Sequence, residues 1–142
     1  MSKEDILQIN TNELMLRKDI QSRIYTIRDS QVMLDMDLAT LYHVETRVLN
    51  QAVKRNLDRF PEQFCFQLTN CEFEILKSQI VMSRWGGRRT NPYAFTEQGV
   101  AMLSGVLKSD VAVEIRIKII NIFVAMRRFI LANAQIFRGW RL

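Results

Sequence analysis

The segment Asp37–Val53 reads DLATLYHVETRVLNQAV and has the pattern of two short helices joined by a tight turn. Ala39 has the small side chain that lets a second helix cross closely, and Val44 provides an apolar anchor after the turn. The turn needs a residue that accepts a positive φ, and histidine, here His43, tolerates this conformation better than most residues other than glycine. The segment therefore predicts a helix-turn-helix.

The second of these helices, expected from about Glu45 to Asp58, separates apolar side chains from polar ones. We expect a buried apolar stripe made of Val48, Leu49, Ala52, Val53 and Leu57. The other side carries Thr46, Arg47, Asn50, Gln51, Lys54 and Arg55. An ordinary pair of amphipathic helices with a solvated polar face shows the same pattern. The pattern alone therefore leaves both interpretations open.

The polar face is chemically suited to DNA. Arginine binds guanine with two hydrogen bonds, and asparagine or glutamine binds adenine in the same way. Recognition helices place their first residues against base edges, so we expect base contacts from Thr46, Arg47, Asn50 and Gln51. Lys54, Arg55 and Arg59 lie further along the chain and are expected to contact phosphates.

Two regions before this segment have their own patterns. Residues 2–22 are expected to form a helix or a loosely attached arm, because their apolar residues recur with a poor helical phase. Ile24–Ile27 and Gln31–Leu34 alternate like strands around a turn at Asp29-Ser30, which predicts a hairpin. Asp35 is then expected to cap the first helix of the pair.

The chain after Pro61 is expected to alternate strands and helices. Thr69 and Glu72 have the spacing of a capping box, so a short helix is expected to follow the strand-like residues 64–67. The runs 80–82 and 93–95 flank Gly86-Gly87 and predict a second hairpin. Thr96 is expected to cap a helix that ends near residue 107, and a long last helix is expected over residues 110–134.

The second predicted hairpin carries a cluster of arginines. Arg84, Arg88 and Arg89 flank Trp85-Gly86-Gly87. Glycine lets a backbone approach a phosphate closely, and three guanidinium groups at one tip attract anions. A basic hairpin beside a helix-turn-helix is typical of the wing of a winged-helix DNA-binding protein. The alternative is a charged surface loop with Trp85 packed into the core.

Length and composition fit these expectations. The 142 residues suit one domain, and the scarcity of glycine and proline favours a mostly helical α+β fold. We expect an arm at 1–22, a DNA-binding domain at 23–134 and a tail at 135–142. The net charge of +5 favours an anionic partner. A recognition helix fits the wide groove of B-form DNA better than the narrow groove of A-form RNA.

Other classes of function find little support in the sequence. Cys65, Cys71 and His43 cannot complete a tetrahedral metal shell without carboxylates, so we expect no metal and no cofactor. No phosphate-cradling motif or Ser-His-Asp set is present, so we do not expect an enzyme. Asp35 and Asp37 are interpreted as first-turn residues that favour the helix dipole. Without a signal peptide or a long apolar run, we expect a cytoplasmic protein with no membrane partner.

Several ordered motifs resemble one family. They are VMLD at 32–35, DLATLY at 37–42, LNQAVKRN at 49–56, RFPE at 59–62, WGGRR at 85–89 and PYAFTEQGVAMLS at 92–104. Together they look like the phage Orf-six N-terminal domain, which is related to the KilA N-terminal domain, over about residues 20–128. The resemblance implies a DNA-binding module of phage and prophage regulators, often followed by a separate C-terminal domain. The chain is therefore expected to be a minimal member or part of a longer protein.

Two partner questions stay open at this stage. The alternative to DNA binding is an antirepressor-type module that acts on a regulator protein. The last helix is apolar around much of its circumference, which favours a homodimer formed through this helix, with the arm crossing to the partner. The other reading of the same helix is that it is the central helix of a single domain.

Overall fold

The computed structural model describes residues 3–79 and 90–133, with side chains from Thr11 onward. The described elements follow in the order α1 (Lys3–Ser22), β1 (Ile24–Ile27), β2 (Ser30–Leu34), α2 (Asp35–Tyr42), α3 (Thr46–Arg55), a 3-10 helix (Leu57–Arg59), β3 (Cys65–Gln67), α4 (Asn70–Gln79), β4 (Tyr93–Phe95), α5 (Glu97–Leu107) and α6 (Asp110–Ala132). This arrangement confirms the expected mostly helical α+β fold.

The four described strands form one antiparallel sheet in the order β1-β2-β4-β3. Ile24 pairs with Met33, Met33 with Phe95, and Phe95 with Cys65, so these residues form one row across the sheet. Since side chains alternate between the faces of a strand, this row points to one side and its neighbours point to the other.

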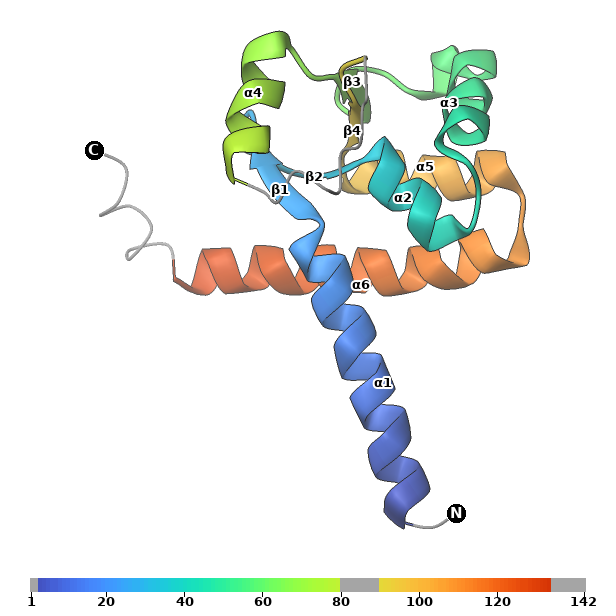
Figure 1. Cartoon of the computed structure of the whole chain (residues 1–142), viewed down its shortest axis with the longest axis vertical. Coiled ribbons are helices and arrows are strands. Elements are labelled where there is room, and N and C mark those ends of the chain that lie inside the picture. Colours follow the sequence, from blue (N-terminus) through green and yellow to red (C-terminus); the bar gives the residue numbers. More distant parts are fainter. Residues whose placement is uncertain (1–2, 80–89, 134–142) are drawn as a thin grey trace.

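Each face of the sheet is covered by helices. The row from Ile24 to Cys65 packs into the main core with α2, α3, α5 and α6, whose buried residues include Leu38, Leu49, Leu103 and Ile119. The opposite face, with Val32, Leu34 and Ala94, packs against α4. The described part of the domain is therefore a thin sheet with α2, α3, α5, α6 and the end of α1 on one side and α4 on the other. Figure 1 shows this arrangement.

The first hairpin is confirmed, although its turn lies one residue earlier than expected. Arg28 and Asp29 occupy the turn with φ of 54° and 61°, and Ser30 already belongs to β2. A two-residue hairpin turn with two positive φ angles has the twist that matches the flanking strands. Aspartate is one of the residues that often adopt a positive φ, so Asp29 suits this turn. Arginine is not one of them, so Arg28 is the less usual residue here.

The expected second hairpin needs a correction. Strand β4 is paired on both sides, with β2 and with β3, so its neighbours come from distant parts of the sequence and not from the run at 80–82. That run and the Gly86-Gly87 turn lie outside the described residues. Sequence proximity suggested a local partner, whereas the sheet places the short strand 93–95 at its centre.

Helix ends follow the sequence signals in most places. The amide of Thr69 donates to Glu72 Oε1 at 2.8 Å, and the amide of Glu72 donates to Thr69 Oγ1 at 3.2 Å, which confirms the capping box. Thr96 caps α5, and α6 begins at Asp110 as expected. Asp35 does not cap α2, because it is the first helical residue and Leu34 precedes it in an extended conformation.

The start of α5 is packed tightly against the segment that leads into β3. Thr96 donates its hydroxyl to the Gln63 carbonyl at 2.7 Å, and its amide donates to the Phe64 carbonyl at 3.0 Å. A Cβ atom at Gly99 would lie 1.9 Å from the Phe64 oxygen. Only glycine fits at this contact between helix and backbone.

Helices α1 and α6 make up the lower half of the molecule in Figure 1. The end of α1 packs against β1 and α6, where Ile20 is fully buried. The rest of α1 extends away from the body as an arm (Figure 1). The backbone of residues 3–22 is thus helical, which is one of the two forms expected for this segment.

Candidate nucleic-acid interface

The turn between α2 and α3 has a defined geometry. His43 has φ 59° and ψ 40°, which confirms the expected positive φ at this position. The amide of Val44 donates to the Ala39 carbonyl at 3.0 Å, and the amide of Leu49 donates to the Glu45 carbonyl at 3.1 Å. These bonds end one helix and begin the next within three residues, and they fix the direction in which α3 leaves α2.

The inner face of α3 is narrower than the sequence suggested. Leu49 and Val53 are buried as expected, and Ala52 is half-buried. Val48 and Leu57 are instead exposed by 41% and 64%. Val48 lies about 100° around the helix from Leu49, and α3 ends at Arg55, so Leu57 no longer follows the period of the helix.

The outer face of α3 carries a row of exposed polar side chains, which we call the α3 row: Arg47, Gln51, Lys54 and Arg55. Thr46 is half-buried at the start of the helix. Arg47 Nη2 lies 3.3 Å from Glu45 Oε2, but both side chains are 73% exposed, and such surface pairs contribute little. Within the described residues, Lys54, Arg55 and the nearby Arg59 form no ion pair. These cations are open to an anionic partner.

Asn50 does not belong to this row, which corrects the expectation that it shares the exposed face. It is half-buried, and its Nδ2 donates to Asp35 Oδ2 at 3.1 Å. The same carboxylate accepts bonds from the amide of Met36 at 2.7 Å and, through Oδ2, from the amide of Tyr93 at 3.3 Å. Asp35 is fully buried, so one carboxylate ties α2, α3 and β4 together.

A second buried carboxylate anchors α2 to the end of α1. Asp37 is 1% exposed, and Arg23 Nη1 lies 2.5 Å from its Oδ1. Arg23 also donates from Nε to Asp19 at 3.1 Å. Asp35 and Asp37 do lie in the first turn of α2, as expected, but the side chains that they bind, Asn50 and Arg23, are far away in sequence. The spacing of residues gave no signal of these contacts, which hold α2 and, through Asn50, α3 in place.

Reactive groups are scarce around this surface. Burial raises the pKa of the Cys65 thiol to about 12, and Asp35 adds to the shift, so this thiol is a poor nucleophile. Cys71 is exposed, and both cysteines are free. In residues 3–79 and 90–133 no group of three or more His, Cys, Asp or Glu side chains is placed to hold a metal ion. Over the same ranges, no helix is long and apolar enough to cross a bilayer.

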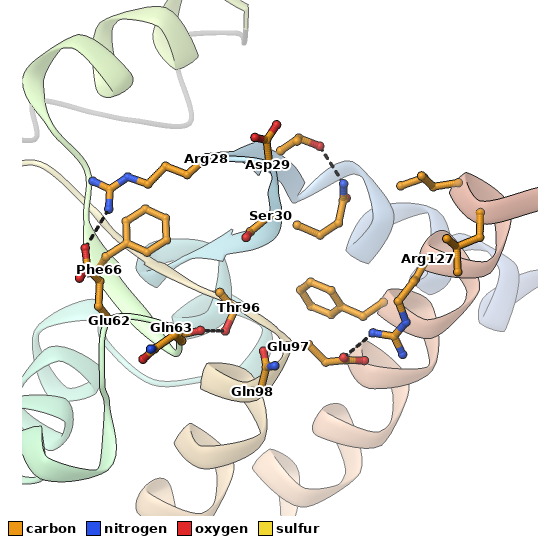
Figure 2. A pocket seen from close by; sticks show the side chains of 15 residues that line it. Arg28, Asp29, Ser30, Glu62, Gln63, Phe66, Thr96, Glu97, Gln98 and Arg127 are labelled. Carbon is orange, nitrogen blue, oxygen red and sulfur yellow. Dashed lines mark hydrogen bonds and ion pairs between the residues drawn. The ribbon is translucent and has the colours of Figure 1, made fainter. Parts of the chain in front are cut away.

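A cavity of about 900 Å³ lies between the hairpin β1–β2, the start of α5 and the end of α6 (Figure 2). Its cations already have partners. Arg28 Nε lies 2.8 Å from Glu72 Oε2, its guanidinium lies 4.1 Å from the centre of the Phe66 ring, and Arg127 Nη1 lies 2.7 Å from Glu97 Oε2. Because these charges are neutralised within the chain, the α3 row is the better candidate for binding an anion.

The other predicted contact residues are placed as follows. Arg59 is exposed at the end of the 3-10 helix, close in sequence to the α3 row. Arg84, Arg88 and Arg89 lie outside the described residues, so the predicted wing has no structural description. The described part of the candidate surface thus consists of α3, its preceding turn and the 3-10 helix.

The fold and this surface define a class: a mostly helical α+β domain that presents one exposed basic helix after a tight interhelical turn. The chain belongs to the ORF6N domain family, whose model matches residues 22–106, more than half of the chain. This confirms the resemblance to the phage Orf-six N-terminal domain. No curated protein and no solved structure matches the chain. The matched residues include α2, α3 and most of α5, whereas α6 lies beyond them.

Proposed function

We propose that this chain binds double-stranded DNA and that α3 enters the major groove as the second helix of a helix-turn-helix. The observation that carries the proposal is the α3 row, exposed on one face of a helix whose opposite face is anchored by Leu49 and Val53. A ten-residue helix is about 15 Å long, and the major groove, about 12 Å wide, admits a helix. Membership of a phage-type domain family agrees with this role.

Each part of the surface has its own role in this proposal. Arg47 and Gln51, with Thr46, read base edges from the first turns of α3. Lys54, Arg55 and Arg59 neutralise phosphates and set the position of the helix on the duplex. Arg84, Arg88 and Arg89 are proposed as further phosphate contacts on the basis of the sequence alone. A protein with this role catalyses no reaction. It acts in the cytoplasm, where the DNA is.

The test combines selection of bound duplexes from a random pool with a salt titration. Each phosphate contact contributes about 0.9 to the slope of log affinity against log salt. Replacing Lys54, Arg55 and Arg59 by alanine should therefore flatten the slope by about 2 to 3 and weaken binding to all sequences. A matched control replaces Lys18, Lys77 and Lys108, which lie outside α3 and the 3-10 helix. An unchanged slope in the first triple variant, with the fold intact, would contradict the proposal.

A protein-binding role remains the second candidate, and one observation favours it. Val48 and Leu57 are exposed beside the α3 row, and exposed apolar side chains suit a protein surface. An antirepressor-type module would use this mixed surface to bind a regulator protein. A gel shift with random duplex at low salt separates the two candidates, because a DNA-binding domain of this charge shifts the duplex and a pure protein-binding module does not.

A further inference from the structure

The outward side of α6 carries a regular stripe of side chains. Positions 113, 117, 120, 124, 127 and 131 follow one another at alternating spacings of four and three residues. They hold Val113, Ile117, Ile120, Val124, Arg127 and Leu131, so all but one are apolar. This spacing keeps side chains on one line along a helix and is the pattern of helices that pair along a shared seam. We call these six residues the α6 stripe.

The side chains of the α6 stripe are only partly covered by the core of their own chain. Val113, Ile117 and Leu131 are exposed by 45%, 53% and 69%, Arg127 is also exposed, and Ile120 and Val124 are half-buried. A different set of residues, Ala112, Ile119, Ile122 and Phe123, forms the buried side of α6. In Figure 1 the sheet, α2 and α5 all lie on one side of α6, and α1 crosses it. A mostly apolar and partly exposed strip about 27 Å long is unusual for a monomer.

We propose that this strip is covered by α6 of a second copy of the chain, running antiparallel to the first. The two-fold axis passes between Ile120 and Val124, near the middle of the α6 stripe. Ile120 then faces the partner's Val124, and Val113 faces the partner's Leu131. Each seam residue finds an apolar partner except Ile117, which faces the partner's Arg127. Arg127 leaves the seam, because its guanidinium turns to Glu97 of its own chain.

The exposed charges beside the α6 stripe determine this direction. Glu114, Asn121 and Arg128 repeat every seven residues along one flank, and all three are exposed. A two-fold axis perpendicular to the helices brings the same flank of both copies together. Glu114 therefore meets the partner's Arg128, and Asn121 meets the partner's Asn121. A parallel pair would place the acidic beginnings of both helices side by side, and such flanking charges decide helix orientation.

The first test measures oligomeric state by light scattering at micromolar concentration. The intact chain should be a dimer, and Val113→Asp, which sets a carboxylate against the partner's Leu131, should be a monomer with unchanged helix content. Glu114→Arg and Arg128→Glu should each weaken the dimer about tenfold at low salt, because two symmetric attractions become repulsions. The double variant should recover the original affinity, and Asp58→Arg, on the 3-10 helix, should change nothing. A monomeric intact chain would overturn the proposal.

A second measurement tests the antiparallel geometry even if the charge variants fold poorly. Asn121→Cys in a Cys71→Ser background should form a disulfide-linked dimer under mild oxidation, because the two copies of position 121 face each other. Glu74→Cys in the same background is the control, since this exposed position lies on α4. A dimer that shows neither cross-linking at position 121 nor rescue by the double charge variant would reject the α6 seam.

Discussion

At the scale of single residues, the structure separates two neighbours that the sequence treated alike. Asn50 and Gln51 are both amides near the start of α3, and both suit adenine. Gln51 is exposed, whereas Asn50 donates to the buried Asp35. The sequence could predict the positive φ of His43 from the local pattern, because turn chemistry is local. It could not predict the bond to Asp35, because that depends on how the helices cross.

This difference between Asn50 and Gln51 can be measured. Gln51→Ala should leave stability nearly unchanged and weaken binding to the preferred duplex by about 1–3 kcal/mol, with little effect on random DNA. Asn50→Ala should lower the free energy of unfolding by about 1–3 kcal/mol, because it removes a donor from a buried carboxylate. Urea unfolding and titrations with both duplexes check the pair. Equal losses on both duplexes for Gln51→Ala would exclude base reading.

At the scale of elements, most helices and the first hairpin were predictable because their signals lie within a few residues. Capping residues such as Thr69 and Thr96 mark where helices begin, and alternating apolar residues mark the hairpin strands. The neighbours of β4 were not predictable, because three residues between two distant strands carry no signal of pairing. Leu57 was misplaced for a related reason: the period of α3 was extended beyond its end at Arg55.

The two glycines of α5 provide a test of how this helix packs against the backbone at Phe64. Gly99→Ala should destabilise the domain by about 3 kcal/mol, because the new Cβ would collide with the Phe64 carbonyl. Gly105→Ala should raise the free energy of unfolding by up to about 1 kcal/mol, because this position is open and alanine favours helix. Thermal and urea unfolding of both variants measure the contrast. Similar values for the two would show that α5 does not pack on Phe64 as described.

At the scale of the whole molecule, ion pairs join elements that are distant in sequence. Arg23 links the end of α1 to α2, Arg28 links the first hairpin to α4, and Arg127 links α6 to α5. The hydrogen bonds from Arg28, together with those from Thr69, lower the pKa of Glu72 to about 2. A carboxyl group whose pKa is lowered by folding stabilises the fold above its ordinary pKa and loses this effect as the pH falls.

The lowered pKa of Glu72 therefore predicts that the free energy of unfolding depends on pH. Glu72→Gln keeps an acceptor for the Thr69 amide but loses the charge, so it should lower the free energy of unfolding by about 1–2 kcal/mol at neutral pH. The difference from the unchanged chain should shrink as the pH falls from about 4.5 to about 2. Urea unfolding across this range measures it, with Glu74→Gln on the same helix as control. A difference that does not vary with pH would contradict the role of the charge.

The central place of β4 has a consequence for how the chain folds. Among the described strands, β2 and β3 are joined only through residues 93–95, which come after both of them in the sequence. During synthesis, the first hairpin can close early, but the sheet stays divided until Phe95 has left the ribosome. Pairing between distant segments is slow, and strand edges that wait for a partner are prone to aggregation. Chains that end before residue 93 should therefore aggregate, although they contain the complete pair of helices α2 and α3.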